Sequence, residues 1–305
     1  FDTCQHIYKL ANGDHIAYRY EVLFSLGAGA FGQVVKVLDH KTGEQIAVKI
    51  IVNTKQMETE GLVESQILNR LKSKSCPNVV QTYEHFVFRN HVCITFEILG
   101  RDLFELMQGR TYSRFLKPFS ESMIRSYAFQ LFQGLAGIHE AGVVHCDIKP
   151  ENILVTCTSR NQIKIIDFGS GCFTGNQMYS YVQSRFFRAP EVVLGIKYGP
   201  AIDIWSAALV IIELMTGRPL FHCENEHELL WMMTELLGLP PDFIVQQSTR
   251  KKNFFDEIRG KFVLKQIPRR YFKPSSLNLM KRLDTTDFQL CDLLLRCLTW
   301  DPNQR

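Results

Sequence analysis

The chain has 305 residues, of which 46% are hydrophobic and 22% charged, fractions typical of a folded globular enzyme. They exclude a disordered, collagen-like or coiled-coil chain, and no apolar stretch is long enough to span a bilayer. Residues 1–15 lack a secretory apolar core, so we expect no signal peptide. Nine cysteines without a C-x-x-C pair indicate reduced thiols in the cytosol or nucleus. Because the chain begins at Phe1 rather than Met, we expect a piece of a longer protein.

The formal net charge of +4 conceals a segregation of charge. Residues 250–282 hold eleven Lys and Arg against two acids, which leaves 24 basic and 29 acidic residues elsewhere. Such a segment can contact nucleic acid or an acidic protein. It contains no nucleic-acid motif, so a solvated insertion is the simpler interpretation.

The first part of the chain has the pattern of β-strands. Residues 20–26 and 33–38 flank a glycine-rich loop, and a third strand follows a turn at 41–44. Apolar residues at helical spacing then predict one helix. In chain order, the expected elements are strands at 20–26, 33–38 and 45–51, a helix at 59–71, and strands at 79–88 and 91–98.

From about Leu103 the pattern changes to long helices, and only a short hairpin interrupts them. The expected helices are 120–141, 201–217, 226–237 and 286–298, and the hairpin is 153–156 with 162–166. A small β-rich part followed by a larger helical part predicts an α+β protein of two lobes. Ligands commonly bind in the cleft between such lobes.

Residues 27–34 read GAGAFGQV, which has the form G-x-G-x-x-G-x-V. A dinucleotide fold needs a helix directly after the glycines, but strand-like apolar residues follow here. The loop therefore bends a hairpin, in which glycines let backbone amides approach phosphates. No G-x-x-x-x-G-K-[ST] is present, which excludes a P-loop NTPase. We expect the nucleotide to contact Leu26, Gly27, Ala28, Gly29, Ala30, Phe31, Gly32, Gln33 and Val34.

Lys49 lies on the next expected strand, directly after Ala47 and Val48. A lysine at this place reaches the α and β phosphates of a nucleotide if an acid holds it. Glu64, on the following helix, is the candidate acid. The alternative is a surface lysine that happens to follow a strand.

Residues 143–154, VVHCDIKPENIL, place His145, Asp147, Lys149 and Asn152 at fixed offsets between two apolar flanks. Asp147 can accept the proton of an attacking hydroxyl, and Lys149 can neutralise charge on a transferred phosphoryl group. Asn152 can supply an oxygen to a magnesium ion. Downstream, Asp167 begins a DFG sequence and offers a second oxygen ligand to magnesium.

With these motifs the chain resembles a eukaryotic protein kinase over nearly its whole length. Residues 189–191 (APE) and 203–206 (DIWS) match two further segments of that family, and Arg305 matches the arginine that pairs with Glu191. The resemblance implies a bilobal kinase fold, ATP and Mg²⁺ as cofactors, and family helices that lie beyond Arg305.

A narrower resemblance is to the dual-specificity tyrosine-regulated kinases of the CMGC group, in their second class. It rests on HCD at 145–147, DFGSGC at 167–172, YSY at 179–181, QSRFFRAPE at 183–191 and HIAYRYEVL at 15–23. The homeodomain-interacting kinases are a competing branch, but they usually have alanine in place of Cys146. The resemblance implies an extension at 1–19 and a kinase domain at 20–305, divided into lobes at about 98–99. It also implies a CMGC insert at about 242–283.

The same resemblance implies the nucleotide pocket and the acids that recognise the substrate. An adenine would lie between Val34, Ala47 and Leu154, with its edge against the backbone of Glu97 and Leu99 and with Phe96 as gatekeeper. Two acids, Glu151 and Glu213, match positions that receive an arginine upstream of the target Ser or Thr, and a following proline is the family preference. Structural salt bridges are the alternative for both acids.

The charged residues after Tyr181 indicate how a phosphate on the activation segment could be bound. Many kinases have an arginine in place of Cys146 that binds the phosphorylated activation loop, and a cysteine cannot do this. Arg185 and Arg188 can instead bind a phosphate on Tyr181. The resemblance implies that the kinase phosphorylates Tyr181 itself and then acts on Ser and Thr. Alternatively, Tyr179 and Tyr181 only pack in a loop.

The sequence therefore predicts a monomeric protein kinase domain that acts on proteins and needs no membrane or nucleic acid. Two other classes stay open: an inactive scaffold of the same fold, and a basic nucleic-acid-binding module at 250–282. Cys146 and Cys172 are expected to approach each other, either as buried residues that only pack in the core or as a redox pair.

Overall fold

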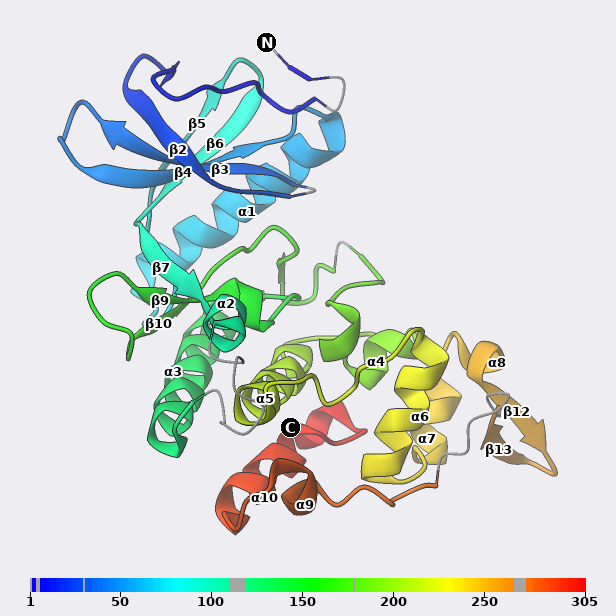
Figure 1. The fold of residues 1–305 in the computed structure, drawn as a ribbon. Coiled ribbons are helices and arrows are strands. Elements are labelled where there is room, and N and C mark those ends of the chain that lie inside the picture. Colours follow the sequence, from blue (N-terminus) through cyan, green and yellow to red (C-terminus); the bar gives the residue numbers. More distant parts are fainter. Residues whose placement is uncertain (1, 4–5, 30, 110–118, 178, 266–272) are drawn as a thin grey trace.

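A computed structural model of the chain describes residues 2–3, 6–29, 31–109, 119–177, 179–265 and 273–305. It has a smaller lobe built on one sheet and a larger lobe built mainly of helices (Figure 1). The predicted α+β bilobal fold is confirmed. The basic residues Arg269 and Arg270, like Ala30 of the glycine loop, lie outside the described residues.

The N-lobe sheet has six strands in the order β1-β2-β3-β4-β6-β5, and each strand is antiparallel to its neighbours. Its strands are β1 (His15–Ile16), β2 (Tyr20–Gly29), β3 (Gly32–Asp39), β4 (Gln45–Ile51), β5 (Thr82–Phe88) and β6 (His91–Phe96). Along β3 the buried residues Val35 and Val37 alternate with half-buried neighbours, the two-residue period of a strand with unlike faces. The sheet thus has one face packed on a small core and another toward the C-lobe.

One long helix, α1 (Lys55–Ser73), packs against this sheet (Figure 1). Ile67, Leu68 and Leu71 are buried on one side of it, at the spacing that predicted a helix. The helix begins at Lys55 rather than at 59, because Thr54 caps it: the Thr54 hydroxyl accepts the Met57 N–H at 3.3 Å. Apart from Met57 the first turn is polar, so periodicity alone did not find it.

Helices dominate the C-lobe. They are α2 (Leu103–Gln108), α3 (Glu121–Glu140), α4 (Pro190–Val193), α5 (Ala201–Thr216), α6 (Glu226–Leu237), α7 (Asp242–Gln247), α8 (Lys251–Phe254), α9 (Leu279–Leu283) and α10 (Phe288–Cys297). Helix α5 is buried on nearly all sides and packs against α3, which makes it the centre of the lobe. Among the described residues, no helix combines the length and the apolar character needed to cross a membrane.

The expectation of a single hairpin among these helices is wrong. The predicted hairpin exists as β9 (Ile153–Thr156) and β10 (Ile163–Ile165), and β7 (Leu99–Asp102) joins it as a third strand. Two further pairs form, between β8 (Val143–Val144) and β11 (Cys172–Phe173) and between β12 (Phe255–Ile258) and β13 (Lys261–Leu264). These strands are two to four residues long, too short to show a two-residue period in the sequence.

A buried ion pair connects the end of the chain to the start of α4. The Arg305 guanidinium donates to both carboxylate oxygens of Glu191, at 2.7 and 2.9 Å, and both side chains are almost fully buried. The same guanidinium lies 5.0 Å from the centre of the Trp205 ring on α5. Arg305 therefore fixes α4 relative to the central helix.

We expect Arg305→Ala to lower the free energy of unfolding by about 3–5 kcal/mol, because it leaves the Glu191 carboxylate buried without its partner. The matched control is Arg296→Ala, which removes an exposed ion pair with Asp292 within α10 and should cost less than about 0.5 kcal/mol. Urea unfolding followed by circular dichroism measures both. If both variants lose the same free energy of unfolding, the buried ion pair contributes no more to stability than the exposed one.

Candidate active site

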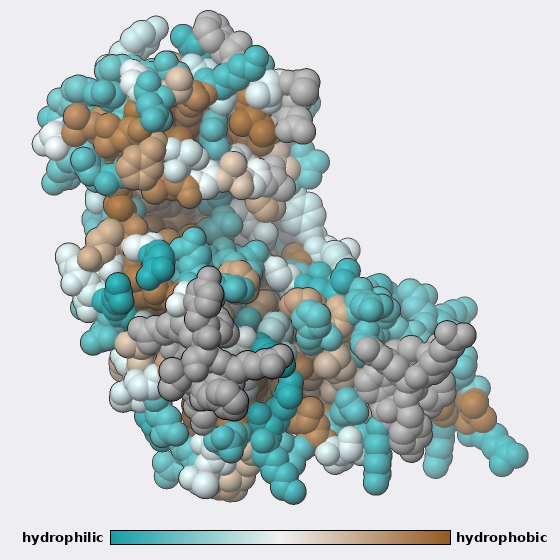
Figure 2. All heavy atoms as spheres, in the orientation of Figure 1, coloured by the Kyte–Doolittle hydropathy of each residue, from teal (hydrophilic) through white to brown (hydrophobic). Residues whose placement is uncertain are grey.

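The register of the sheet gathers the predicted pocket residues on one face. Val34 pairs with Lys49 and Ala47 pairs with Phe96 across neighbouring strands. Paired residues, and residues two apart on one strand, point to the same side of a sheet, so these four side chains share a face. Lys49 reaches Asp167 of the other lobe from it, so the face is turned toward the C-lobe. Figure 2 shows hydrophobic side chains gathered where the two lobes meet.

The junction between the lobes supplies the remaining pocket positions. Leu154 lies on β9, where it pairs with Asp102 of β7, and Leu99 begins β7. The Glu97 N–H donates to the Gln81 carbonyl at 3.0 Å. Glu97 also receives Lys164 on its carboxylate, so its side chain is used in holding the junction together.

The loop between β2 and β3 is a hairpin, as the motif predicted, with Gly29 paired to Gly32. Gly32 has φ 148°, and a Cβ there would lie 2.1 Å from the carbonyl oxygen of Ile50. Only glycine fits this close approach of β3 to β4. Leu26 and Phe31, which flank the turn, are exposed.

Lys49 joins the two lobes through its ammonium group. Its Nζ donates to both carboxylate oxygens of Glu64 on α1, at 2.7 and 2.9 Å, and to Oδ1 of Asp167 at 2.8 Å. The side chains of Lys49 and Glu64 are buried. The acid predicted to hold Lys49 is therefore in contact with it, and a surface position for this lysine is excluded.

Electrostatics favour the charged forms of Lys49 and Asp167, whereas burial raises the pKa of Glu64 above its ordinary value. Burial alone would lower the pKa of Lys49, but the charges of Glu64 and then Asp167 raise it above its ordinary value. At Asp167 burial works the other way, yet the Lys49 charge prevails and lowers the pKa of the carboxyl. Asp167 is therefore an anion that faces the region between the lobes.

Asp147 lies at the centre of a hydrogen-bonded loop. Its Oδ2 accepts Lys149 Nζ at 2.6 Å and Asn152 Nδ2 at 3.2 Å. Its Oδ1 accepts the backbone N–H and the hydroxyl of Ser184, at 3.1 and 2.8 Å. Four donors thus fix the orientation of the carboxylate. The structure brings Asp147, Lys149 and Asn152 together as predicted, and it adds Ser184, which the sequence analysis missed.

The His145 side chain binds the same loop, and its hydrogen bonds fix the tautomer of the imidazole. Its Nε2 lies 2.9 Å from the Ile166 carbonyl, which can only accept, so Nε2 carries the proton. Its Nδ1 then accepts the Asp147 N–H at 3.1 Å. The imidazole therefore links the loop that bears Asp147 to the strand that leads to Asp167.

Asp203, at the start of α5, is a buried anchor for this loop. Its carboxylate accepts the N–H of His145 at 2.8 Å and the N–H of Cys146 at 3.0 Å. Cys146 has φ 67° and Asp167 has φ 61°, left-handed values that cost energy in residues other than glycine. The hydrogen bonds to Asp203 offset that cost at Cys146. The sequence analysis placed Asp203 on the helix but missed this function.

Cys146 and Cys172 approach each other, as expected. Their sulfur atoms are 3.9 Å apart and both side chains are buried. The hydrogen bond between the two thiols, and next burial, raise the pKa of Cys146. Each of the cysteines that the structure describes is a free thiol.

The two tyrosines of the activation segment have opposite surroundings. The Tyr181 hydroxyl accepts Arg188, whose guanidinium lies 3.9 Å from the centre of the Tyr181 ring. The Tyr179 hydroxyl instead donates to the Glu60 carboxylate. Of the two arginines predicted to hold a phosphate, only Arg188 contacts Tyr181, because Arg185 donates to the Glu224 carbonyl at 2.6 Å.

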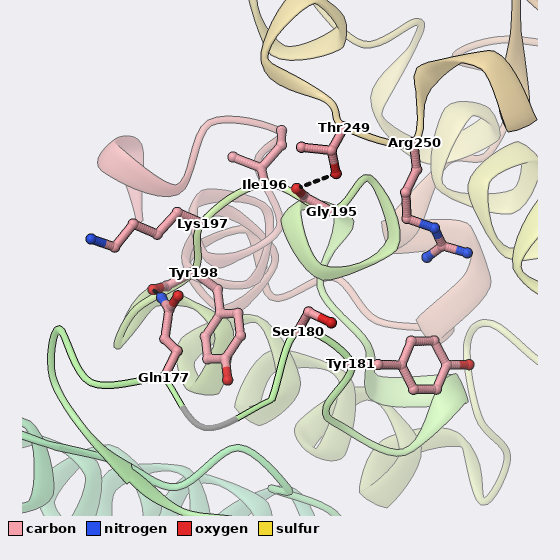
Figure 3. Close-up of a pocket in the computed structure, with 9 residues that line it drawn as sticks. All are labelled: Gln177, Ser180, Tyr181, Gly195, Ile196, Lys197, Tyr198, Thr249 and Arg250. Carbon is pink, nitrogen blue, oxygen red and sulfur yellow. Dashed lines mark hydrogen bonds between the residues drawn. The ribbon is translucent and has the colours of Figure 1, made fainter.

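A pocket of about 380 Å³ opens beside Tyr181 (Figure 3). Its walls come from the activation segment, from residues 195–198 and from Thr249 and Arg250. The Thr249 hydroxyl donates to the Gly195 carbonyl at 2.8 Å and fixes one wall. Tyr181 is 53% exposed and lines this pocket.

Glu213 is an unusual acid for a central helix. It is buried, and its Oε2 has no hydrogen-bond partner among the described residues. Burial, and then the nearby charge of Glu151, raise the pKa of Glu213 to about 7. The second predicted recognition acid, Glu151, is thus close enough for its charge to act on Glu213. Neither acid forms a salt bridge with a described residue.

Comparison with known proteins agrees with this geometry. The protein kinase domain family matches residues 20–305. The chain belongs to the protein kinase family. It is 42% identical to dual specificity tyrosine-phosphorylation-regulated kinase 2 of Drosophila melanogaster and 43% identical to the human kinase 4 of that name, over all of the chain. DYRK-family kinase pom1 of Schizosaccharomyces pombe is also 43% identical to it. The chain spans 42%, 58% and 28% of these three proteins.

The basic segment of this kinase domain uses part of its charge within the fold. Arg250 forms an ion pair with Glu226 at 2.6 Å and donates to the Val193 carbonyl at 2.8 Å. Lys265 donates to the Lys252 carbonyl at 2.7 Å. These contacts tie the segment to α6 and to itself, so a nucleic-acid-binding module is not favoured.

The raised pKa of Glu213 predicts how stability depends on pH. The folded state binds this proton more tightly than the unfolded chain, so its stabilising effect is complete below about pH 4.5 and is lost as the pH rises through about 7. Glu213→Gln should abolish this loss and gain up to about 3 kcal/mol over the parent at high pH. Urea unfolding at pH 5 and pH 8 measures the difference. A difference that is the same at both pH values would contradict the assignment.

Proposed function

We propose that the domain is an active ATP-dependent protein kinase that phosphorylates Ser and Thr in proteins and its own Tyr181. The observation that carries this proposal is the simultaneous contact of Lys49 with Glu64 and Asp167. In kinases these contacts form when the nucleotide-binding lysine, the helix of the N-lobe and the DFG aspartate are all in place for phosphoryl transfer. An inactive scaffold has no need of this arrangement.

The side chains around Asp147 suit the transfer itself. The Asp147 carboxylate would orient the substrate hydroxyl and accept its proton, and Lys149 would stabilise charge on the transferred phosphoryl group. Ser184 holds the carboxylate through Oδ1, whereas Lys149 and Asn152 bind Oδ2, and the Ser184 hydroxyl also accepts Lys149 Nζ at 3.3 Å. It is a positioning residue, because it acts on Asp147 and not on the substrate.

Asn152 and Asp167 fit a magnesium ion. The amide nitrogen of Asn152 is used in bonds to the backbone and the side chain of Asp147, which leaves the amide oxygen as the ligand atom. Asp167 is ionised beside Lys49. Bound Mg²⁺ would neutralise charge on the nucleotide phosphates. Lys49 and the backbone of the glycine loop would hold those phosphates, and Val34, Ala47 and Leu154 would hold the adenine.

Charge selects Tyr181 over Tyr179 as the modified residue. A phosphate carries a charge of about −1.5 to −2 at neutral pH. On Tyr181 it would face the guanidinium of Arg188, and on Tyr179 it would face the carboxylate of Glu60. Arg185 would strengthen the first site by leaving the Glu224 carbonyl for the phosphate.

We expect protein made in bacteria to carry phosphate on Tyr181, whereas Asp147→Asn protein carries none, because its amide cannot accept the hydroxyl proton. Intact mass and phosphopeptide mapping measure this directly. Tyr179→Phe serves as the matched control and should keep the phosphate. Tyr181→Phe should lose it.

Absence of any phosphorylation would contradict the proposal of an active kinase. If the parent carries no phosphate, and added magnesium-ATP neither modifies it nor labels a Ser or Thr peptide, the domain is a scaffold. Thermal unfolding of each variant checks that the loss of phosphate does not reflect loss of the fold.

We also propose that Glu213 and Glu151 bind an arginine that precedes the target residue. The buried Glu213 Oε2 lacks a partner, and a guanidinium would supply charge-assisted hydrogen bonds to it. Between otherwise identical peptides, the parent should then prefer arginine over alanine by about tenfold or more in kcat/KM, mainly through KM.

Glu213→Gln should reduce this preference to less than threefold. The exposed Glu121→Gln on α3 is the control and should retain it. Steady-state kinetics on the two peptides measures both variants. If Glu213→Gln keeps the full preference, the pair has only a structural function.

The domain limits, the insert at 242–283, a preference for a following proline and a monomeric state in the cytoplasm or nucleus remain part of the proposal. They follow from the family resemblance and from the reduced cysteines. The class within the dual-specificity family is proposed on the same basis.

A further inference from the structure

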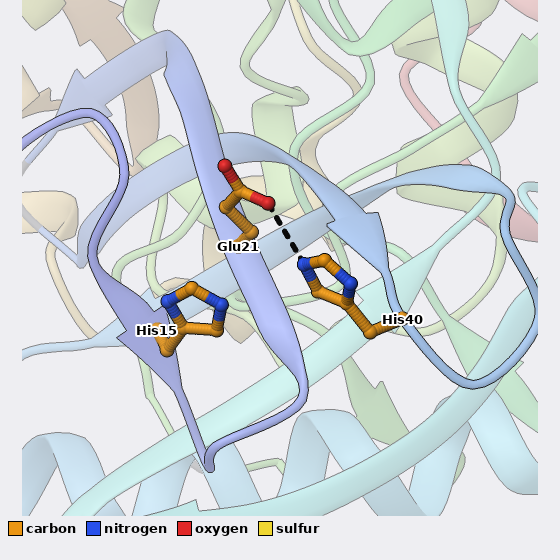
Figure 4. A group of neighbouring side chains, drawn as sticks. All are labelled: His15, Glu21 and His40. Carbon is orange, nitrogen blue, oxygen red and sulfur yellow. Dashed lines mark hydrogen bonds and ion pairs between the residues drawn. The ribbon is translucent and has the colours of Figure 1, made fainter.

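Three side chains of types that can bind a metal meet on the N-lobe sheet. His15 comes from β1, Glu21 from β2 and His40 from the turn after β3 (Figure 4). One ligand atom from each lies within 4.8 Å of the other two. The kinase mechanism uses none of these residues.

The backbone fixes the three positions independently of their side chains. His15 and Glu21 are direct partners in the β1–β2 pair, so their side chains lie on the same face. The His40 N–H donates to the Arg19 carbonyl at 3.1 Å. The Asp39 carboxylate accepts the Lys41 N–H at 2.9 Å and so orders the turn that carries His40.

The hydrogen bonds of the two imidazoles suit metal binding. His15 Nδ1 lies 3.1 Å from the Gly13 carbonyl, which can only accept, so Nδ1 carries the proton and Nε2 is bare in the neutral ring. A metal-binding histidine commonly donates its other N–H to a backbone carbonyl in this way. His40 Nε2 lies 2.8 Å from Glu21 Oε2. A cation that binds between these two atoms would replace the proton they share.

We propose that His15, Glu21 and His40 bind one Zn²⁺ ion, which fastens the N-terminal extension to the N-lobe sheet. Two imidazoles and a carboxylate are a ligand set that Zn²⁺ accepts, with water in the fourth position. In tetrahedral coordination the ligand atoms lie about 3.3 Å apart. The His15 and His40 rings are stacked, with centroids 5.3 Å apart and 20° between their planes, so the imidazoles must rotate for both to bind one ion.

The local charge permits a cation here. Arg19, the arginine that binds His40 through its backbone, has its guanidinium neutralised by Asp39 at 2.6 Å and Glu84 at 2.7 Å. Strand β1 has only two residues, and the extension is also held by the buried Ile16 and by backbone hydrogen bonds of Gly13 and Asp14 with Val22. A metal that connects His15 to His40 adds a cross-link between the extension and the β3–β4 turn.

The test is a calorimetric titration of chelator-treated protein with Zn²⁺, in excess Mg²⁺ so that the nucleotide site is not available to zinc. The parent should bind one Zn²⁺ per chain. Glu21→Gln and His40→Gln should each weaken binding at least tenfold. His85→Gln, which removes another exposed histidine of the same sheet, should bind as the parent does.

Amide hydrogen exchange tests the fastening. Zn²⁺ should slow exchange in residues 13–20 of the parent and leave these residues unchanged in Glu21→Gln. Equal zinc affinity in the parent and in both site variants, or no binding at all, would overturn the site. Stoichiometric binding without protection of residues 13–20 would overturn the fastening. Because the three side chains are at the surface, the variants should melt at the temperature of the metal-free parent.

Discussion

The arrangement of the two lobes depends on the neutralisation of one buried ammonium group. Lys49 cannot be buried without opposite charges, and Glu64 on α1 and Asp167 of the C-lobe supply them at 2.7 and 2.8 Å. Each carboxylate belongs to a different structural unit, so the ion cluster fixes helix α1, strand β4 and the DFG segment relative to one another. If any of the three moves away, a charge stays buried without its partner, which costs several kcal/mol. Coulombic attraction here selects one placement of these three segments, and the proposed phosphoryl transfer rests on that placement.

A second buried charge does the same for the catalytic loop. Asp203 receives the N–H groups of His145 and Cys146, and it also lies 3.0 Å from His139 of α3. The central helix thereby holds the loop in a backbone conformation that it would not adopt alone, with Cys146 at φ 67°. Asp147 follows directly, so its carboxylate points where Lys149, Asn152 and Ser184 can bind it. The hydrogen bonds with the buried helix α5 thus stabilise the strained backbone of the loop.

The sequence predicted those parts of the fold in which local pattern and tertiary packing agree. Strands β4 and β9 and helix α6 have the expected bounds, because their apolar residues mark the buried side. The hairpin of β12 and β13 was missed, since its strands FDEI and KFVL lie in a charged segment and bury few side chains. Pairing in such strands depends on partners that no local pattern reveals. The start of α1 was missed for a related reason, because its cap and first turn are polar.

The site residues also fall into those that a local sequence motif reveals and those that only the fold brings together. Lys49, Asp147, Asn152 and Asp167 stand in recognisable motifs, whereas Ser184 lies 37 residues from Asp147 and Asp203 lies 57 from Cys146, in contacts that only the fold creates. Tyr179 and Tyr181 illustrate this, since the family resemblance and the two following arginines favoured Tyr181, but nothing in the sequence revealed which side chain contacts either hydroxyl. Glu60 meets the first from 119 residues away, and Arg188 meets the second. The difference in charge around the two hydroxyls is therefore a property of the folded chain, and the proposal that Tyr181 is the phosphorylated residue rests on it.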